Sequence, residues 1–349
     1  MPLYREATLK DDSRLLKLIN SAGMPGIIQL MTTRAPSFFN LIAQRGQCKV
    51  IVAEEENEIV GIICINHETV FLNKVPSKLF YICDFRVQYA YRKKGIGLQL
   101  TNKAVDYMEE QDGDFVFLNV SKGNKRPFVF FSNRKHYPDF ENIGIFNIYQ
   151  FLGSKKKSKD EFQVVKTTLH PKIIEFLNEY HANYQLAPVV DYHQLKDATI
   201  YKVEVNGDLI AVMCIVDYSN CKQHIALKLP WYLRLFVFLI NLLGSITGAN
   251  PLPSTNQPIK MLYIKYLAIK KKDKKLIRSL IRCAQNEAHS KSYSFVSLGL
   301  HEKDALIQRL PRFFRIKFNS VGMLVTMKNN HRLMDVVRKG IPYKDFSTV

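Results

Sequence analysis

Several short runs of the chain alternate between apolar and polar positions or are almost continuously apolar, and both patterns are typical of β-strands. In the first third of the sequence, such runs cover residues 3–8, 48–53, 59–65, 78–87 and 115–120. The polar residues 54–58 separate two of these runs, which predicts a β-hairpin. The pattern therefore predicts a β-sheet in this part of the chain.

Between the predicted strands, apolar residues recur at the spacing of an α-helix. Asp11 or Asp12 can cap a first helix. Residues 26–44 predict a second helix, which Pro36 breaks or kinks, and residues 95–110 predict a third. The expected buried faces of the first and third helices consist of Leu15, Leu16, Leu18 and Ile19, and of Ile96, Leu100, Ala104, Tyr107 and Met108. Strands and helices together predict an α/β (α+β) fold.

The second half of the sequence repeats the pattern of the first. Residues 51–65 align with 201–215 at an offset of 150, 81–87 with 263–269 at an offset of 182, and 115–120 with 295–300 at an offset of 180. The order of elements is kept, which indicates a duplicated domain. The jump in offset indicates an insertion of 32 residues between Asp217 and Lys260.

The stretch between the two copies, GSKKKSKDE at residues 153–161, contains no bulky apolar side chain and is predicted to be a solvated, basic linker. We therefore expect a first domain at residues 1–152 and a second at 162–349, with the apolar insertion near residues 220–258.

The insertion contains the most apolar segment of the chain, WYLRLFVFLINLLGSI, from Trp231 to Ile246. It is short for a membrane-spanning helix and carries Arg234 and Asn241. The main expectation is a helix packed on a domain core or between the domains. The alternative is an exposed apolar face that contacts lipid, a hydrophobic substrate or a second subunit.

The composition restricts the possible partners and the cellular location of the protein. The 50 Lys and Arg against 31 Asp and Glu give a charge of +19, which favours an anionic partner. The basic residues are scattered rather than gathered on one helix with interleaved aromatics, which argues against nucleic acid. The six cysteines lie far apart, without CxxC, and the histidines have no metal-binding spacing, so we expect reduced thiols and no metal. The charged N-terminal residues lack a signal-peptide pattern, so a cytoplasmic location is predicted.

The strand at residues 78–87 leads into a turn with the pattern R-x-x-G-x-G, formed by Arg92, Gly95 and Gly97. The glycines let the backbone approach a ligand closely, and the following helix directs its N-terminal amides and positive dipole end at the same place. Arg92, Lys93 and Lys94 add positive charge. The turn is therefore predicted to bind a pyrophosphate. It lacks the GK[ST] of a P-loop and the third glycine of a dinucleotide fingerprint.

With Val87 in front of it, this turn resembles the V-x-P-x-x-R-x-x-G-x-G motif of the GCN5-related N-acetyltransferases, the GNAT superfamily, with Tyr89 in the proline position. The hairpin VAEEENEIVGII before it is similar to the second and third strands of that family. The specific motifs cover residues 3–152, and the strand order extends the likeness to about residue 328. The whole chain resembles a tandem GNAT protein, with two domains that are each a mixed, mostly antiparallel sheet flanked by helices.

The resemblance implies that acetyl-CoA, or another acyl-CoA, binds to the first domain. The implied cofactor-binding residues are Phe85, Arg86, Val87, Arg92, Lys93, Lys94, Gly95, Ile96, Gly97 and Asn124. Asp84 is the candidate general base, because members of the family often carry an acidic residue there and a carboxylate in an apolar strand tends to have a raised pKa. The alternative is a structural carboxylate paired with Arg86. Cys83 is expected to face the other way and to be a buried structural thiol.

Two departures from the family pattern concern catalysis. The family often has a tyrosine seven residues after the asparagine that aligns with Asn124, as general acid, and this position is Phe131. Tyr137 is the candidate substitute. In the second copy, residues 269–276 contain no glycine and Tyr266 replaces Asp84, so that copy is predicted not to bind CoA.

The resemblance implies an N-acyltransferase, most simply an acetyltransferase, whose acceptor is a small-molecule or protein amine held between the two domains. Three alternatives stay open: a non-catalytic sensor of acyl-CoA, a Fem-type aminoacyl transferase that uses aminoacyl-tRNA, and a membrane-surface enzyme that acts on a lipid or a lipid-linked amine. The intact R-x-x-G-x-G turn favours CoA over aminoacyl-tRNA.

Overall fold

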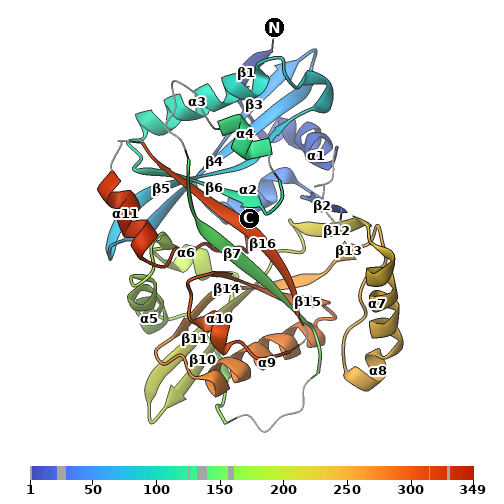
Figure 1. Ribbon diagram of the computed structural model, residues 1–349, viewed down its shortest axis with the longest axis vertical. Coiled ribbons are helices and arrows are strands. Elements are labelled where there is room, and N and C mark those ends of the chain that lie inside the picture. Colours follow the sequence, from blue (N-terminus) through green and yellow to red (C-terminus); the bar gives the residue numbers. More distant parts are fainter. Residues whose placement is uncertain are drawn as a thin grey trace.

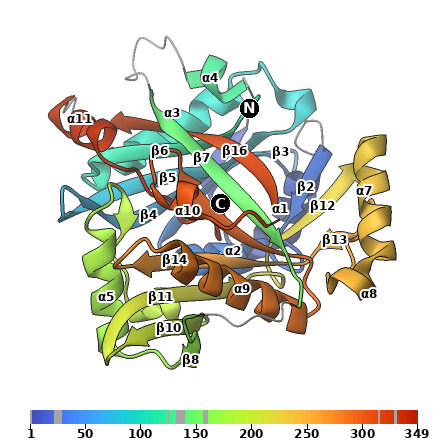
Figure 2. The same cartoon turned by 60° about the horizontal axis from the view of Figure 1, so that its bottom comes forward.

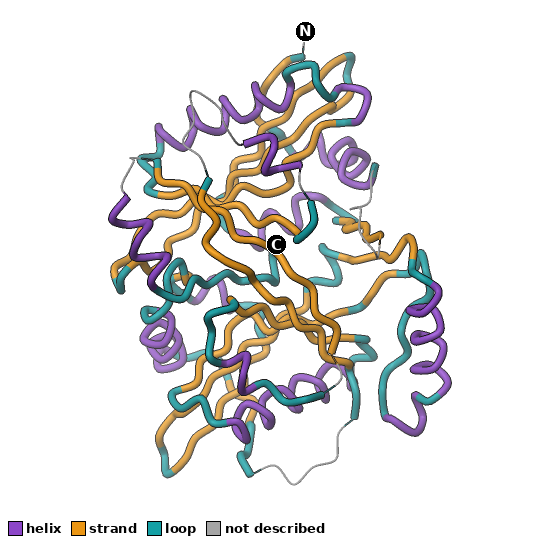
Figure 3. The backbone as a smooth tube through the Cα atoms, in the orientation of Figure 1, coloured by secondary structure: helices purple, strands orange, loops and turns teal. Residues whose placement is uncertain are grey.

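The computed structural model describes residues 2–21, 29–124, 126–131, 140–155, 161–313, 315–327 and 331–349. A 13-stranded sheet runs through the whole molecule, and helices cover both of its faces (Figures 1 and 3). Its strand order is β1-β3-β4-β5-β6-β16-β7-β15-β14-β11-β10-β8, with the short strand β9 beside β4. Apart from β5–β6 and β14–β15, the pairs in this order are antiparallel. The predicted α/β class and the mostly antiparallel sheet are confirmed.

The strands of the large sheet fall into a first group, a second group and a middle pair. The first group is β1 (Leu3–Glu6), β3 (Cys48–Glu55), β4 (Glu58–Leu72), β5 (Val75–Val87) and β6 (Phe115–Ser121). The second group is β8 (Val165–Thr167), β9 (Ala187–Pro188), β10 (Thr199–Val205), β11 (Asp208–Asp217), β14 (Met261–Ile269) and β15 (Phe295–His301). The middle pair is β7 (Glu141–Leu152) and β16 (Arg315–Thr326).

The two groups repeat one pairing pattern. In the first, β3–β4 and β4–β5 are antiparallel and β5–β6 is parallel. In the second, β10–β11 and β11–β14 are antiparallel and β14–β15 is parallel. The predicted hairpins 48–65 and 201–215 and the strands that follow them are therefore present. This repeat supports the predicted duplication.

The middle strands join the groups in an interleaved order. β16 lies between β6 and β7, and β7 pairs with β15 on its other edge. A strand before residue 153 is thus paired on both sides by strands that come after it. The proposed boundary at residues 152 and 153 remains a prediction, and the sheet is continuous across it (Figure 3).

Helices pack on both faces of each group. The longer helices are α1 (Asp12–Asn20), α2 (Phe38–Arg45), α3 (Ile96–Glu110), α5 (Pro171–His181), α7 (Trp231–Leu242), α9 (Lys274–Ser290) and α11 (His331–Lys339). The shorter ones are η1 (Leu9–Asp11), η2 (Tyr89–Tyr91), α4 (Arg126–Phe131), α6 (Tyr192–Leu195), α8 (Gly244–Thr247) and α10 (Leu306–Arg309). In the first group, α3 packs on one face of the sheet and α1 and α2 on the other. In the second group, α9 and α5 take the two faces (Figure 2).

The predicted helix at residues 26–44 is wrong over its first part. Residues 29–33 form strand β2 (Gln29–Thr33), and α2 begins only at Phe38. β2 pairs with β12 (Gln223–Lys228), which also pairs with β13 (Pro258–Ile259) in a separate three-stranded sheet. The pairing partner of β2 lies in the insertion of the second half, so the local sequence gave no sign of it.

Three smaller expectations can also be compared with the structure. The start of the predicted linker, Gly153 and Ser154, is buried rather than solvated, because Gly153 donates its N–H to Ser294 O and Ser154 pairs with Ala249; residues 156–160 lie outside the described part. All six cysteines are free. No helix among the described residues has both the length and the apolar character needed to cross a membrane.

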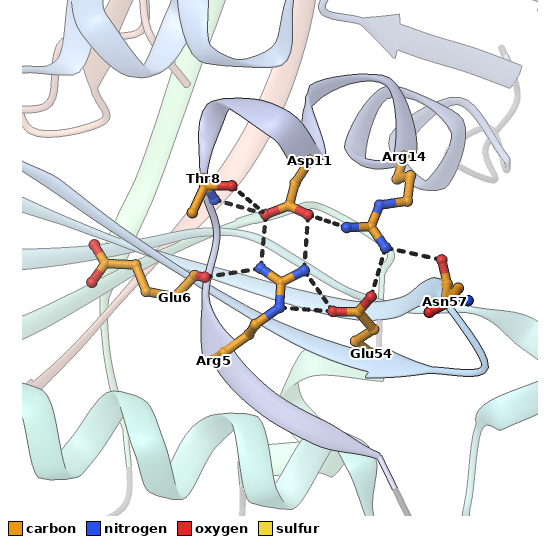
Figure 4. A network of polar contacts seen from close by, with 7 residues as sticks. All are labelled: Arg5, Glu6, Thr8, Asp11, Arg14, Glu54 and Asn57. Atoms are coloured by element: carbon orange, nitrogen blue, oxygen red, sulfur yellow. Dashed lines mark hydrogen bonds and ion pairs between the residues drawn. The ribbon is translucent and has the colours of Figure 1, made fainter.

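A buried ion-pair network fixes the N-terminal segment to the sheet (Figure 4). Asp11 is almost fully buried and accepts hydrogen bonds from Arg5, Arg14 and the Thr8 backbone N–H. Both arginines also contact the carboxylate of Glu54, at 2.7 Å from Arg5 Nε and 2.6 Å from Arg14 Nη1. The network ties β1, η1 and α1 to the end of β3.

Candidate functional site

The two parallel strands of the first group separate toward their C-terminal ends. β5 pairs with β6 from Leu79 opposite Phe115 to Ile82 opposite Leu118, although β5 continues to Val87 and β6 to Ser121. A β-bulge bends β5 just past this point: Cys83 lies opposite Cys64, but Arg86 already lies opposite Ile62. The β6-facing edge of β5 is therefore open from the bulge onward, and it can pair with an extended, amide-containing ligand as with an added strand.

The open strand end leads directly into the predicted turn. Gly95 is the N-cap of α3 with φ of +80°, which glycine adopts without strain, and no side chain caps the helix there. The first amides of α3 have no partner within the helix. Arg92 to Gly95 are exposed, and a side chain at Gly95 would meet no atom within 4 Å. Open backbone amides, a helix N-terminus and three cations thus meet at one exposed place, which fits a pyrophosphate.

The second group has the same strand separation but a closed turn. β14 pairs with β15 only as far as Tyr263 opposite Ser297, yet β14 continues to Ile269. At the start of α9, the Asp273 carboxylate accepts hydrogen bonds from the N–H groups of Lys275 and Leu276, at 2.6 and 3.0 Å. An internal carboxylate already occupies the place where an anion would bind. This contrast supports the prediction that only the first turn binds CoA.

Asp84 does not have the raised pKa that the sequence analysis predicted. It sits in the bulge with φ of +50°, and its carboxylate forms ion pairs with Arg34 and, at 2.6 Å, with Arg45. Burial by itself raises the pKa of this carboxyl, but the two guanidinium groups outweigh burial and lower its pKa to about 2. The structural alternative also needs correction, because the partners are Arg34 and Arg45 rather than Arg86.

The bulge also changes where Cys83 lies. Arg45 Nη1 contacts both Cys83 Sγ, at 3.1 Å, and Asp84 Oδ2, so the two side chains meet the same guanidinium. The prediction that Cys83 faces away from Asp84 is therefore wrong, because the extra residue of a bulge interrupts strand alternation. Arg86 donates to the backbone carbonyls of Leu18 and Ile19 at the C-terminal end of α1.

Arg34 and Arg45 are the site residues that sequence reasoning missed. Both are nearly fully buried. Arg45 also donates to Thr348 O from Nε and Nη2, at 2.9 and 2.8 Å. The Nε and Nη1 groups of Arg34 are buried and have no hydrogen-bond partner in the described part of the chain. A single arginine without a surrounding motif carries no recognisable signal, so only tertiary contacts could reveal them.

Aromatic rings line the first turn of α3 on the α4 side. Phe85 lies 5.2 Å from Phe130 and 5.9 Å from Phe131, measured between ring centroids, and Phe131 lies 5.3 Å from Phe140. Phe131 thus packs in this cluster and has no proton to donate. Asn124 lies between β6 and α4, and its N–H donates to Ser121 O. Tyr137, the candidate general acid, lies outside the described residues.

A pocket of about 290 Å³ lies between the two halves of the chain. Its lining combines Arg45, His67 and Glu68 of the first half with Lys265 of the second. Further lining residues are Gln44, Gly46, Gln47, Asn66, Thr69, Lys78, Leu186, Pro188, Val189, Asp191, His193, Gln194, Tyr266, Lys344, Asp345 and Thr348. Because Arg45 reaches both the pocket and Asp84, the pocket adjoins the bulge of β5.

Comparison with known proteins points to one family. Residues 23–128 match the model of the acetyltransferase (GNAT) family, and this range includes the hairpin, the bulge and the turn. A curated relative, the L-2,4-diaminobutyric acid acetyltransferase of Shouchella clausii (strain KSM-K16), is 27% identical over 116 residues. The alignment covers 33% of this chain and 62% of that relative, so this chain matches less than two thirds of the relative's length.

Solved structures extend the likeness beyond the matched range. A GCN5-related N-acetyltransferase from Anabaena variabilis aligns with 93% of this chain and 72% of its own, with a TM-score of 0.55 and 12% identity. N-myristoyltransferase of Saccharomyces cerevisiae with bound myristoyl-CoA aligns with 93% of this chain and 84% of its own, with a TM-score of 0.59 and 11% identity. A putative acetyltransferase from Pyrococcus horikoshii aligns with 98% of this chain and 94% of its own, with a TM-score of 0.54 and 12% identity.

At such identities the structural matches show a shared fold, and they show it for both halves of the chain. The sequence match falls on the elements that build the open strand end and the turn. The family model thus relates residues 23–128 to the GNAT family, the curated relative is an acetyltransferase, and a GCN5-related N-acetyltransferase shares the fold over both halves of the chain.

Proposed function

We propose that the protein is an acyl-CoA-dependent N-acyltransferase that transfers an acetyl group from acetyl-CoA to an amine. The observation that carries the proposal is the open end of β5, which runs directly into an exposed, basic turn with uncapped helix amides. One continuous surface thus offers a backbone edge for a pantetheine arm and an anion site for a pyrophosphate.

In this proposal, different residues bind different parts of the acetyl-CoA donor. The amides of Lys93 to Gly97 hold the pyrophosphate, with Arg92, Lys93 and Lys94 supplying positive charge. The backbone of Phe85 to Val87 pairs with the pantetheine amides, and the thioester then lies near the bulge. The buried Nε and Nη1 groups of Arg34, which have no partner among the described residues, lie next to Asp84 and supply positive charge near that place.

The reaction is a direct transfer. The neutral amine attacks the thioester carbonyl carbon, the C–S bond breaks, CoA leaves as the thiolate, and the nitrogen loses one proton. The products are an amide and free CoA. Asp84 as the base remains a prediction, and its pKa of about 2 counts against it, because a carboxylate of so low a pKa is a weak proton acceptor. The ion pairs of Asp84 favour a role for this carboxylate in positioning Arg34 and Arg45.

The acceptor is proposed to be a polar amine that enters through the pocket between the halves. Charges of both signs line this pocket, including Glu68 and Asp345 as well as Lys78 and Lys265. The relative from Shouchella clausii acts on an amino acid with two amino groups, which supports an acceptor of this kind. A protein amine remains the alternative acceptor.

A second candidate function is an acyl-CoA sensor without turnover. It is favoured by Phe131, which packs against Phe85, Phe130 and Phe140 at the position where many relatives are expected to carry a proton-donating tyrosine.

Isothermal titration calorimetry with acetyl-CoA tests the donor site. We expect the wild type to bind and Gly95→Glu to lose at least about tenfold in affinity, because the variant adds a negative charge at the anion site and a side chain at positive φ. Gly207→Glu is the matched control, since Gly207 has φ of +84°, has no atom within 4 Å of an added Cβ, and lies in the hairpin turn of the second half.

Absence of heat with the wild type, or equal loss of binding in both variants, would contradict the donor site. When binding is established, release of free CoA with a panel of amines, including L-2,4-diaminobutyrate, separates the enzyme from the sensor. Binding without release under every amine favours the sensor.

A further inference from the structure

The insertion in the second half presents an apolar face to solvent. Its helix α7 and the short α8 stand at the edge of the molecule (Figures 1 and 2). Trp231, Phe238, Leu242 and Ile246 are 76%, 60%, 62% and 81% exposed. Trp231, Phe238 and Leu242 are seven and four residues apart, so they lie along one side of α7, and Ile246 follows in α8. Tyr232, Leu235, Leu239 and Leu243 are also exposed and widen this apolar face.

The helix that carries the apolar face is held in place by contacts with the rest of the protein. On the opposite side of α7, Phe236, Val237 and Ile240 pack against a core cluster. Asn241 exchanges two hydrogen bonds with the backbone of Leu252, at 3.0 and 2.7 Å. The strand that leads into α7, β12, pairs with β2 of the first half. The helix therefore holds a fixed orientation, with one side on the protein and an equally apolar side in water.

The segment that carries this face contains basic residues but no acidic ones. Residues 218–260 include no Asp or Glu. Lys228 and Arg234 are exposed near the start of α7, and Lys155 is exposed beside the end of α8, where its N–H donates to Gly248 O. None of these three cations forms an ion pair with another described residue. An apolar face bordered by cations at both ends complements a surface that is apolar inside and anionic outside.

We propose that α7 and α8 bind the surface of an anionic lipid membrane. α7 has 12 residues and is about 18 Å long, shorter than the ~30 Å hydrocarbon core, so it lies in the interface with its apolar face among the acyl chains. Trp231 and Tyr232 stand at its beginning, where aromatic rings are favoured at the membrane–water boundary. Lys155, Lys228 and Arg234 contact the phosphate groups.

Trp231 makes the test direct, because it is the only tryptophan of the chain. We expect its fluorescence emission to shift to shorter wavelength when vesicles of phosphatidylcholine and phosphatidylglycerol are added to the full-length protein. Brominated lipids should quench it, and the protein should co-sediment with the vesicles. Vesicles of phosphatidylcholine alone should bind at least about tenfold more weakly, and high salt should weaken binding to the anionic vesicles.

Two variants give the matched comparison. Phe238→Glu should lower the partition into anionic vesicles by about tenfold or more, because it puts a charge among the acyl chains. Val75→Glu, at a residue that is likewise exposed but lies in the β4–β5 hairpin, should leave binding unchanged. Both variants should keep the far-ultraviolet circular dichroism and the melting temperature of the wild type.

Three results would overturn the proposal. The first is an unchanged Trp231 emission and no co-sedimentation with anionic vesicles. The second is equal binding to neutral and anionic vesicles at every salt concentration. The third is a concentration-dependent dimer, seen by light scattering, that Phe238→Glu dissociates while no vesicles are bound, which would assign the face to a second copy of the chain.

Discussion

Asp84 owes its environment to a single extra residue in β5. The bulge turns its carboxylate toward Arg34 and Arg45, which come from the end of β2 and from α2. Three charged side chains are thereby buried together, and such a group is stable only while each charge keeps its partners. The same arrangement keeps the carboxyl ionised, because its pKa is lowered to about 2.

At this scale we predict that Asp84→Asn destabilises the protein by about 3–5 kcal/mol, because the substitution leaves two guanidinium groups buried beside a neutral amide. Urea denaturation at neutral pH measures the free energy of unfolding. Glu58→Gln is the control: it removes an exposed pair with Lys17 and should cost at most about 1 kcal/mol. Equal stability of the two variants would show that the Asp84 ion pairs contribute little.

The residue scale also shows what the sequence could not reveal about the site. The glycine and the cations of the turn could be read directly, because the need for positive φ and for charge is local to residues 92–97. The pKa of Asp84 could not be predicted, because the direction of its shift depends on two arginines that lie about 40 and 50 residues earlier along the chain.

At the scale of elements, the N-terminal segment depends on carboxylates. Asp11, in η1, accepts hydrogen bonds from Arg5 and Arg14. Glu54, at the end of β3, accepts hydrogen bonds from the same two arginines (Figure 4). Hydrogen bonds from the arginines lower the pKa of both carboxyl groups. A lowered folded-state pKa contributes stability that is present above the unfolded-state value and is lost as the pH falls below it.

We therefore predict that the free energy of unfolding decreases as the pH falls from about 5 toward 3, and that Asp11→Asn shows a smaller decrease, because it removes one of the titrating groups. At neutral pH the variant should be less stable by about 3 kcal/mol, since it breaks a buried ion pair. Urea denaturation across this pH range measures both effects.

Asp106→Asn serves as the control, because Asp106 is exposed on α3 and lies 3.9 Å from its partner Lys103. It should leave the pH dependence close to that of the wild type. A wild-type slope in Asp11→Asn would contradict the proposed role of the network.

Elements also differ in how far the sequence predicted them. Both hairpins, the strands after them and α3 follow from local patterns, because one face of each is buried against its own neighbours in sequence. Strand β2 does not, because its partner β12 lies about 190 residues further along the chain. The same reason applies to α7, whose apolar residues predicted burial although one side of the helix faces solvent.

At the scale of the whole molecule, the two halves share strands through β7 and β16. β16 fills the place between β6 and β7, so a fragment that ends at residue 161 lacks the neighbour of both strands. One edge of β6 and both edges of β7, which also loses β15, would then be unpaired, which is an aggregation risk.

We predict that residues 1–161 expressed alone are insoluble or unfolded, and that co-expression with residues 162–349 restores a stable complex. Circular dichroism and size-exclusion chromatography measure the outcome, with the full-length chain as reference. A soluble, cooperatively unfolding fragment 1–161 would instead support two independent domains with a boundary at residues 152 and 153.

The sequence by itself determined the fold class, the repeated strand order and the position of the basic, glycine-containing turn before α3, and it carried the likeness to the GNAT family. These depend on side-chain periodicity, backbone conformation and charge over a few neighbouring residues. Only the tertiary structure decided the interleaved order of β7 and β16 in the sheet, the pairing of β2, the ion pairs of Asp84 and the exposure of α7. Each of these is a contact between segments far apart in the chain, or the lack of one, and no local pattern encodes which distant partner a segment meets.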